Sequence, residues 1–279
     1  QQQSTVSGLG SVVGAALAAH MDVDKISFTG PTAVGKGLLT AAQGNLKRLT
    51  LELGGKSPTV IMAEADLERA IPSAAGGIFR NAGQMCAAGS RLLVARGVME
   101  TVIEGISGHA NALKVGPGLD PATTMGPLVS EAQQRRVSGF IDTARQEGVR
   151  IAAGGGPVDG PGYFVQPTVL VDETGDATVS REEIFGPVLV VTPFDDPAEI
   201  ESKANATIYG LSANIWTRDV TAAYRLAKKI KAGTITVNSG MVVGASIPFG
   251  GFKQSGWGRE GGLEGLAAFT ETKSIITAI

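Results

Sequence analysis

The chain has 279 residues, with 24 basic and 26 acidic side chains and a sequence pI near 5.8. Its apolar content of 43% with 18% charged residues excludes global disorder, and its length suits one large domain or two small ones. The near-neutral charge gives no case for nucleic acid or a membrane surface as partner, and no apolar run approaches the ~20 residues that span a bilayer.

Residues 1–5 lack the basic and apolar regions of a signal peptide, and the single cysteine, Cys86, excludes an intramolecular disulfide. Both features favour a cytoplasmic protein. The 39 glycines are about twice the usual share of ~7% and follow no period. They predict a fold rich in turns and close backbone contacts.

Strands and helices are predicted to alternate along the chain, in the order strand 25–29, helix 34–42, strands 49–53 and 59–62, helix 66–81, strand 92–95 and helix 99–113. The second half continues with helix 130–147, strands 150–153, 164–171 and 188–192, helix 197–205, strand 211–216, helix 220–230 and strand 234–238. Alternation of this kind predicts an α/β fold, in which helices cover parallel sheets.

Two glycine motifs near the N-terminus suggest nucleotide binding. Residues 8–14 read GLGSVVG, which is close to a dinucleotide fingerprint but has only seven residues before it for the required strand. Residues 30–36 read GPTAVGK and match a phosphate-binding loop. However, Gly37 replaces the hydroxyl residue that holds magnesium, and Pro31 removes a backbone donor. A glycine-rich turn from strand to helix remains a good place for a pyrophosphate.

Two further residues stand out by their chemistry. Glu52 lies in an apolar strand followed by two glycines, where it could pair with a lysine or act as a general base. Cys86 lies among Gly, Asn and Gln at a predicted helix end, which suits an activated thiolate as well as a buried small residue. Residue type alone does not separate these alternatives.

Five blocks together resemble the aldehyde dehydrogenase superfamily, in the order of that family and from about Gly8 to the C-terminus. They are FTGPTAVGK at 28–36, LELGGKSP at 51–58, GQMC at 83–86, EEIFGP at 182–187 and PFGGFKQSG at 248–256. The resemblance implies oxidation of an aldehyde to a carboxylic acid with NAD or NADP, through a thioester on a cysteine. It implies no metal.

The same resemblance implies roles for individual residues. Cys86 matches the nucleophile and Glu52 the base that activates water. The residues that match cofactor contacts are Gly30, Pro31 and Gly35 in the turn beside the pyrophosphate, Leu53, and Glu183 and Phe185 at the nicotinamide ribose. Candidate substrate residues are Arg80, Met85, Val243, Phe249 and Asn238. Among these, Arg80 matches a position where semialdehyde dehydrogenases bind a substrate carboxylate.

The family's chain is nearly twice as long, so this sequence resembles its second half. We expect residues 1–54 to complete a Rossmann-like cofactor domain, 55–258 to form the catalytic domain, and 259–279 to return to the first domain. A strand at 274–279 is expected to serve in a homo-oligomer of the full-length form. Open strand edges and poor turnover are expected of the chain by itself.

Two other functions are kept as alternatives. One is a phosphate-loop nucleotidase, which the GPTAVGK motif suggests and Gly37 disfavours. The other is a non-catalytic remnant that serves in assembly. A magnesium-dependent ATPase assay distinguishes the nucleotidase from an aldehyde dehydrogenase. The reactivity of Cys86 distinguishes the non-catalytic remnant from one.

Overall fold

The computed structural model describes residues 3–279 and divides them into two compact units. Unit 1 contains the chain up to Gly54 together with Val243–Ile279, and unit 2 is Gly55–Val242. The return to unit 1 therefore comes at residue 243, earlier than the residue 259 expected from the sequence. The reason is that residues 247–262 hydrogen-bond among themselves and, through β10 (Gly256–Trp257), with β2 (Arg48–Glu52).

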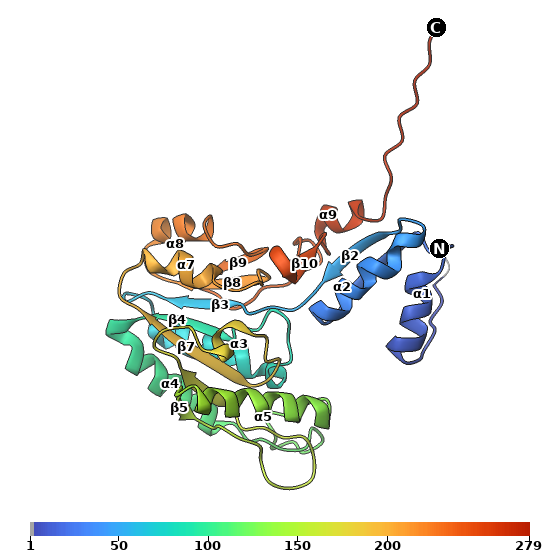
Figure 1. The fold of residues 1–279 in the computed structure, drawn as a ribbon. Helices are drawn as coiled ribbons and strands as arrows, with labels where there is room; N and C mark the ends of the chain where they lie inside the picture. The colour runs from blue at the N-terminus through green and yellow to red at the C-terminus, as the bar shows by residue number, and fades with distance from the viewer. Residues whose placement is uncertain (1–2) are drawn as a thin grey trace. The chain divides into compact units, whose positions relative to one another are not determined.

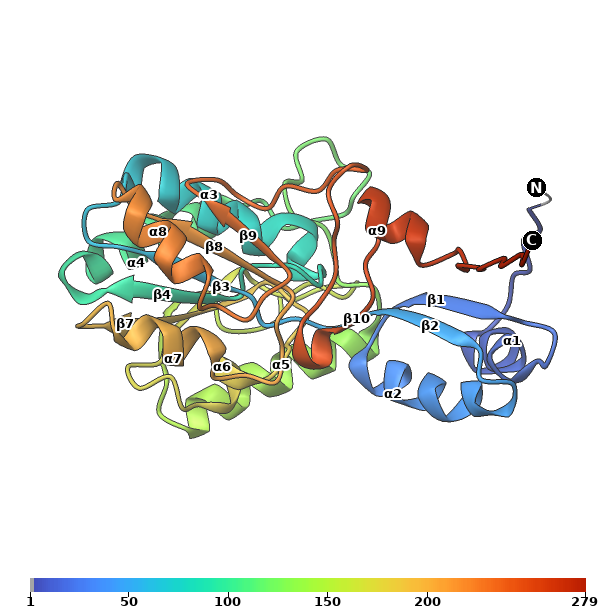
Figure 2. The ribbon, with the colours of Figure 1, turned by 90° about the horizontal axis from the view of Figure 1, so that it is seen from above.

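Unit 1 is built on a βαβ motif, in which a helix connects two parallel strands. β1 (Lys25–Thr29) and β2 pair in parallel through the crossover helix α2 (Thr32–Ala41), and β10 pairs antiparallel to the other side of β2 (Figure 2). The remaining elements of unit 1 are η1 (Gly10–Gly14), α1 (Ala15–Ala19), η2 (Ala42–Gly44), η5 (Lys253–Ser255) and α9 (Gly262–Ala267). The described residues before Gly10 form no strand, and the structure adds no support to the fingerprint interpretation of residues 8–14.

Unit 1 leaves much of its apolar surface open. Within the described chain β1 and β10 are both edges of the three-stranded sheet. Large apolar side chains are exposed on several of its segments, among them Leu17, Trp257 and Phe269. Residues 270–279 form no helix or strand, and Ile276 is 93% exposed. The strand expected at 274–279 is therefore absent, since no segment of the described chain pairs with it.

Unit 2 is a seven-stranded sheet of order β5-β6-β7-β4-β3-β8-β9, parallel except for the β5–β6 pair. The predicted α/β fold with parallel sheets is thus confirmed. Its strands are β3 (Pro58–Ile61), β4 (Arg91–Ala95), β5 (Arg150–Ala153), β6 (Thr168–Val171), β7 (Val188–Phe194), β8 (Ser212–Trp216) and β9 (Thr234–Val237).

Helices cover both faces of this sheet (Figure 1). One face packs against α3 (Leu67–Phe79), α4 (Met99–Ala112) and α5 (Glu131–Gln146), and the other against α7 (Glu199–Asn205) and α8 (Val220–Ala227). Successive side chains of a strand point to opposite faces, so Val60 joins one apolar core and Ile61 the other. The short elements η3 (Arg80–Gly83), η4 (Arg96–Val98) and α6 (Thr178–Arg181) complete the unit.

Candidate functional site in two units

The amino edge of the unit 2 sheet gathers three of the segments that the sequence analysis singled out. Residues 55–57 lead into β3, residues 84–90 into β4 and residues 182–187 into β7. Because β3, β4 and β7 are neighbouring parallel strands, their amino ends lie at the same edge. Gly55 joins the three segments: its N–H donates to Glu183 Oε1 at 2.9 Å, and a Cβ at this position would overlap the carbonyl oxygen of Cys86.

Cys86 lies half-buried at the end of an unusual turn. Asn81, Ala82 and Gly83 follow one another in the left-handed region, with φ of 54°, 51° and 69°. Only glycine adopts this conformation without strain, and strained backbone concentrates at functional sites. A Cβ at Gly83 would overlap the carbonyl oxygen of Gly186, so a glycine is needed there for space as well. The thiol is therefore presented by a turn that packs directly on the 182–187 loop.

The loop that carries Glu183 and Phe185 is also strained and firmly held. Phe185 is left-handed, with φ 58°, and 37% exposed. Burial raises the pKa of Glu183, although the N–H of Gly55 and the charges of Arg136 and Lys56 act in the opposite direction. A carboxylate fixed by a backbone N–H beside an exposed aromatic ring can bind a ribose hydroxyl and cover a flat ring. The structure thus brings Cys86, Glu183 and Phe185 together.

Lys56 is a functional candidate that sequence reasoning missed. Its side chain is 1% exposed, and Nζ has no hydrogen-bond partner in the described chain. Burial, and next the positive charge of Arg91, lower the pKa of Lys56 to about 7, against the attraction of Glu183 and Glu182. The only available signal was a lysine directly after two glycines in a run that is otherwise apolar.

In unit 1, Glu52 is the last residue of β2 and is 3% exposed. Both carboxylate oxygens lack hydrogen-bond partners among the described residues. Burial, and next the negative charge of Glu260, raise the pKa of Glu52 to about 8, while Arg259 acts in the opposite direction. An unpaired carboxyl group with a pKa near neutrality has the property that a general base needs.

The cofactor residues expected in unit 1 lie around the start of α2. Gly30 follows β1 directly, Pro31 is the N-cap, and Gly35 packs on Leu53 so closely that a Cβ would lie 2.6 Å from Leu53 Cδ2. The Gly54 N–H donates to Thr32 Oγ1, tying β2 to this helix. Only two residues separate β1 from α2, so Thr32 to Lys36 are helical. They do not form the loop that would surround a triphosphate, and the phosphate-loop interpretation is wrong.

The candidate substrate residues fall in both units. Arg80 is exposed at the end of α3 and Met85 is half-buried beside Cys86, both in unit 2. Val243, 69% exposed, and Phe249, which exchanges two backbone hydrogen bonds with Glu260, belong to unit 1. Arg80 has the exposure that recognition of a carboxylate would need.

Asn238 is not near the other unit 2 residues. It follows β9 at the carboxyl edge of the sheet, about 16 Å from the amino edge for strands of five residues. Its amide donates to Thr217 O and accepts from Thr217 N, at 2.8 and 3.0 Å. These bonds hold Asn238 in the left-handed region, with φ 52°. Within unit 2, Asn238 thus lies at the sheet edge opposite to the one that carries Cys86, and its expected role at the substrate stays a prediction.

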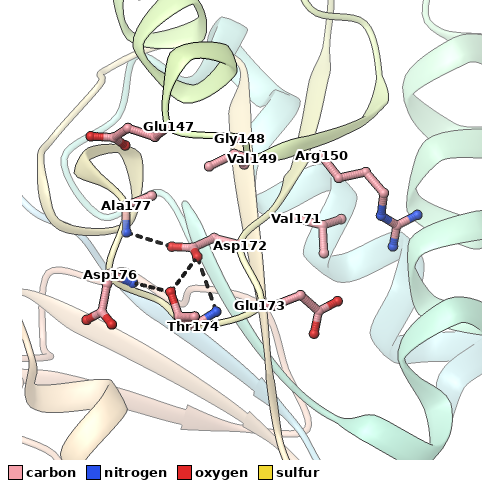
Figure 3. Close-up of a pocket in the computed structure, with 10 residues that line it drawn as sticks. All are labelled: Glu147, Gly148, Val149, Arg150, Val171, Asp172, Glu173, Thr174, Asp176 and Ala177. Atoms are coloured by element: carbon pink, nitrogen blue, oxygen red, sulfur yellow. Dashed lines mark hydrogen bonds between the residues drawn. The ribbon is translucent and has the colours of Figure 1, made fainter.

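A cleft of about 680 Å³ lies elsewhere in unit 2, near the ends of β5 and β6 (Figure 3). Its buried carboxylate, Asp172, accepts hydrogen bonds from Thr174, Ala177 and Ser180. Burial alone would raise the pKa of Asp172, but these bonds together hold it below its ordinary value. All of these donors lie within the eight residues that follow Asp172. The carboxylate therefore serves to fix the conformation of the loop after β6.

Residues 3–279 contain no group of three or more His, Cys, Asp or Glu side chains placed to hold a metal ion. Over the same residues, no helix combines the length and the apolar character needed to cross a bilayer.

The fold and the site define a mixed α/β protein in which a Rossmann-like βαβ unit accompanies a second unit that presents a thiol. The sequence profile of the Aldehyde dehydrogenase family matches residues 3–275, and the chain belongs to this family.

Relatives and solved structures agree with this assignment. The chain is 44% identical over 275 residues to the mitochondrial aldehyde dehydrogenase of Homo sapiens, covering 98% of this chain and 53% of the relative. It is 45% identical over 273 residues to an aldehyde dehydrogenase of Aspergillus niger, covering 98% and 55%. An NAD+ complex of the Bacillus cereus enzyme superposes with a TM-score of 0.94 at 48% identity, covering 96% and 55%. The chain thus spans just over half the length of these relatives.

Proposed function

We propose that this chain carries the catalytic thiol of an NAD- or NADP-dependent aldehyde dehydrogenase, which oxidises a small aldehyde to a carboxylic acid. The observation that carries the proposal is the packing of the Cys86 turn, through Gly55 and Gly83, against the loop of Glu183 and Phe185. Hydride removal requires the substrate on the nucleophile to lie beside the nicotinamide. A carboxylate that binds the nicotinamide ribose next to the thiol would meet this requirement. The solved relative bound to NAD+ favours NAD.

In this proposal Cys86 attacks the aldehyde carbon as a thiolate and forms a thiohemiacetal. A bound nicotinamide supplies the hydride acceptor. The carbon then remains as a thioester on Cys86, and Glu52 takes a proton from the water that hydrolyses it. Because the pKa of Glu52 is about 8, its base form grows as the pH rises toward that value. Hydrolysis should therefore accelerate from pH 6 to 8.

Each unit, taken by itself, has residues that fit a part of a dinucleotide. The first-turn N–H groups of α2, which a helix leaves unpaired, would face a pyrophosphate beside Gly30, although Pro31 contributes no N–H. Gly35 and Leu53 pack together behind this turn. In unit 2, Glu183 and Phe185 would hold the nicotinamide ribose.

Arg80 favours an acidic substrate, such as a semialdehyde, within the same proposal. It is exposed, lies six residues before Cys86 and forms no ion pair in the described chain. We also propose that residues 270–279, extended and without a strand partner here, pair with another chain in a homo-oligomer.

The proposal is tested with the only cysteine as reporter. NAD should slow the alkylation of Cys86 by iodoacetamide, and supplying the other half of a family chain should give NAD-dependent oxidation of an aldehyde. Cys86→Ser should abolish that oxidation while leaving NAD binding intact. Absence of both cofactor protection and activity in the completed protein would favour the non-catalytic alternative.

A further inference from the structure

Gln84, two residues before Cys86, ties the thiol-bearing turn to a helix far away in the sequence. Its Oε1 accepts the N–H of Val129 at 2.9 Å, and its Nε2 donates back to Asn81 O at 3.3 Å. Val129 immediately precedes Ser130, the N-cap of α5, whose hydroxyl accepts from Gln133 N. The start of α5 is therefore fastened to the turn that presents Cys86.

The next turn of the same helix reaches the other half of the unit 2 site. Gln133 Nε2 donates to Phe185 O at 2.8 Å and to Ile184 O at 3.2 Å. Arg136 Nη2 donates to Glu183 O at 2.7 Å, with its guanidinium 5.1 Å from the ring centre of Phe140. Three consecutive loop carbonyls are thus held from one helix face, across the left-handed residue Phe185.

These contacts all join a side chain to a backbone group, and each involves one of the two strained segments. Each donor binds a backbone carbonyl of a strained, partly exposed loop, and Gln84 binds a backbone N–H at the entry to the helix. A shift of α5 along its axis would therefore move the thiol turn and the Glu183 loop together. Two strained segments with a shared support have the geometry in which energetic coupling is expected.

We propose that α5 is a positioning element that couples the Cys86 turn to the Glu183–Phe185 loop, with Gln84 as the positioning residue on the thiol side and Arg136 on the loop side. The inference rests on the proposed function in one respect: that function makes the Glu183–Phe185 loop a contact of the cofactor. The coupling itself concerns the reactivity of one thiol.

A double-mutant cycle on the full chain tests this coupling. The variants are Gln84→Met, Arg136→Met and the double variant, and the readout is the alkylation rate of Cys86 by iodoacetamide from pH 6 to 9. Each single variant should change the rate about 3–10-fold, and the double variant should change it by much less than the product of the two. Arg135→Met is the matched control, because Arg135 lies beside Arg136 and forms its ion pair with Glu131; it should leave the rate unchanged.

Arg136→Lys keeps a donor for Glu183 O, so its alkylation rate should lie closer to that of the unchanged chain than the rate of Arg136→Met does. If the arginine acted only through packing of its side chain, the two variants would behave alike. Equal rates for Arg136→Met and Arg135→Met, or effects that simply multiply, would overturn the coupling. Repeating the cycle with NAD separates the two proposals. Coupling without cofactor protection refutes only the proposed function, and protection with multiplicative effects refutes only the coupling.

Discussion

Gly83→Ala is the sharpest test of how the Cys86 turn is built. Alanine in the left-handed region costs roughly 1–2 kcal/mol, and its Cβ would overlap the carbonyl oxygen of Gly186. Overpacking of a buried contact adds roughly 1–3 kcal/mol, so we expect a loss of about 3 kcal/mol. For a unit of this size, that loss lowers Tm by about 6–12 °C.

Gly76→Ala is the matched control, because Gly76 lies in the helix α3 with nothing within 4 Å of an added Cβ. Replacing a helical glycine by alanine stabilises by roughly 0.5–1 kcal/mol, so its Tm should rise by about 1–4 °C. Thermal unfolding followed by circular dichroism measures both variants. Melting of the two variants within about 1 °C of each other would refute the contact between the Cys86 turn and the 182–187 loop.

Substitutions at three further positions probe the buried charges and the start of α2. Glu52, with a pKa near 8 rather than 4.5, keeps a proton in the folded state that the unfolded chain releases, so stability should fall by roughly 2 kcal/mol and Tm by about 8–16 °C from pH 6 to 8. Glu52→Gln should remove this fall; an equal fall in the variant would contradict the assignment. Lys56, with a pKa near 7 rather than 10.5, is disfavoured when charged, so Lys56→Met should raise Tm by several degrees at pH 7 and by less at pH 9. A gain that does not shrink with pH would mean that packing, not charge, is responsible. Pro31→Ser should supply the missing N-cap hydroxyl and stabilise by about 1 kcal/mol in a melting experiment, whereas Pro31→Ala should not.

Most of the strands could be predicted from the sequence because each is a short apolar run ending at glycine or a polar turn. The predicted strand 25–29 coincides with β1, and 150–153 with β5. Elements without such a run were missed. Residues 10–19 are helical although glycine and alanine dominate them, and β10 has only two residues, paired through contacts distant in the sequence.

Site residues could be predicted where their chemical type and their local sequence both indicate a function. They could not be predicted where their position depends on the arrangement of strands in the sheet. Cys86 and Glu183 are brought to one edge because their loops both precede parallel strands. Asn238 follows β9, and its place at the opposite edge depends on the parallel pairing of β9 with β8. Lys56 escaped notice because its unpaired Nζ depends on neighbours that only the folded chain supplies.

The position of the unit 2 site explains why its backbone is strained. A loop that precedes a parallel strand must reverse the chain from the end of a helix within a few residues, and at β4 this reversal uses Asn81, Ala82 and Gly83 in the left-handed region. Of these residues only Gly83 is free of steric cost, so the other two need compensation. The amide of Asn81 donates to Gln84 O, and Gln84 in turn accepts from the N–H of Val129, just before the N-cap of α5. The strain that presents the thiol is therefore sustained by side-chain amides, and replacing those amides should relax the turn before it unfolds the sheet.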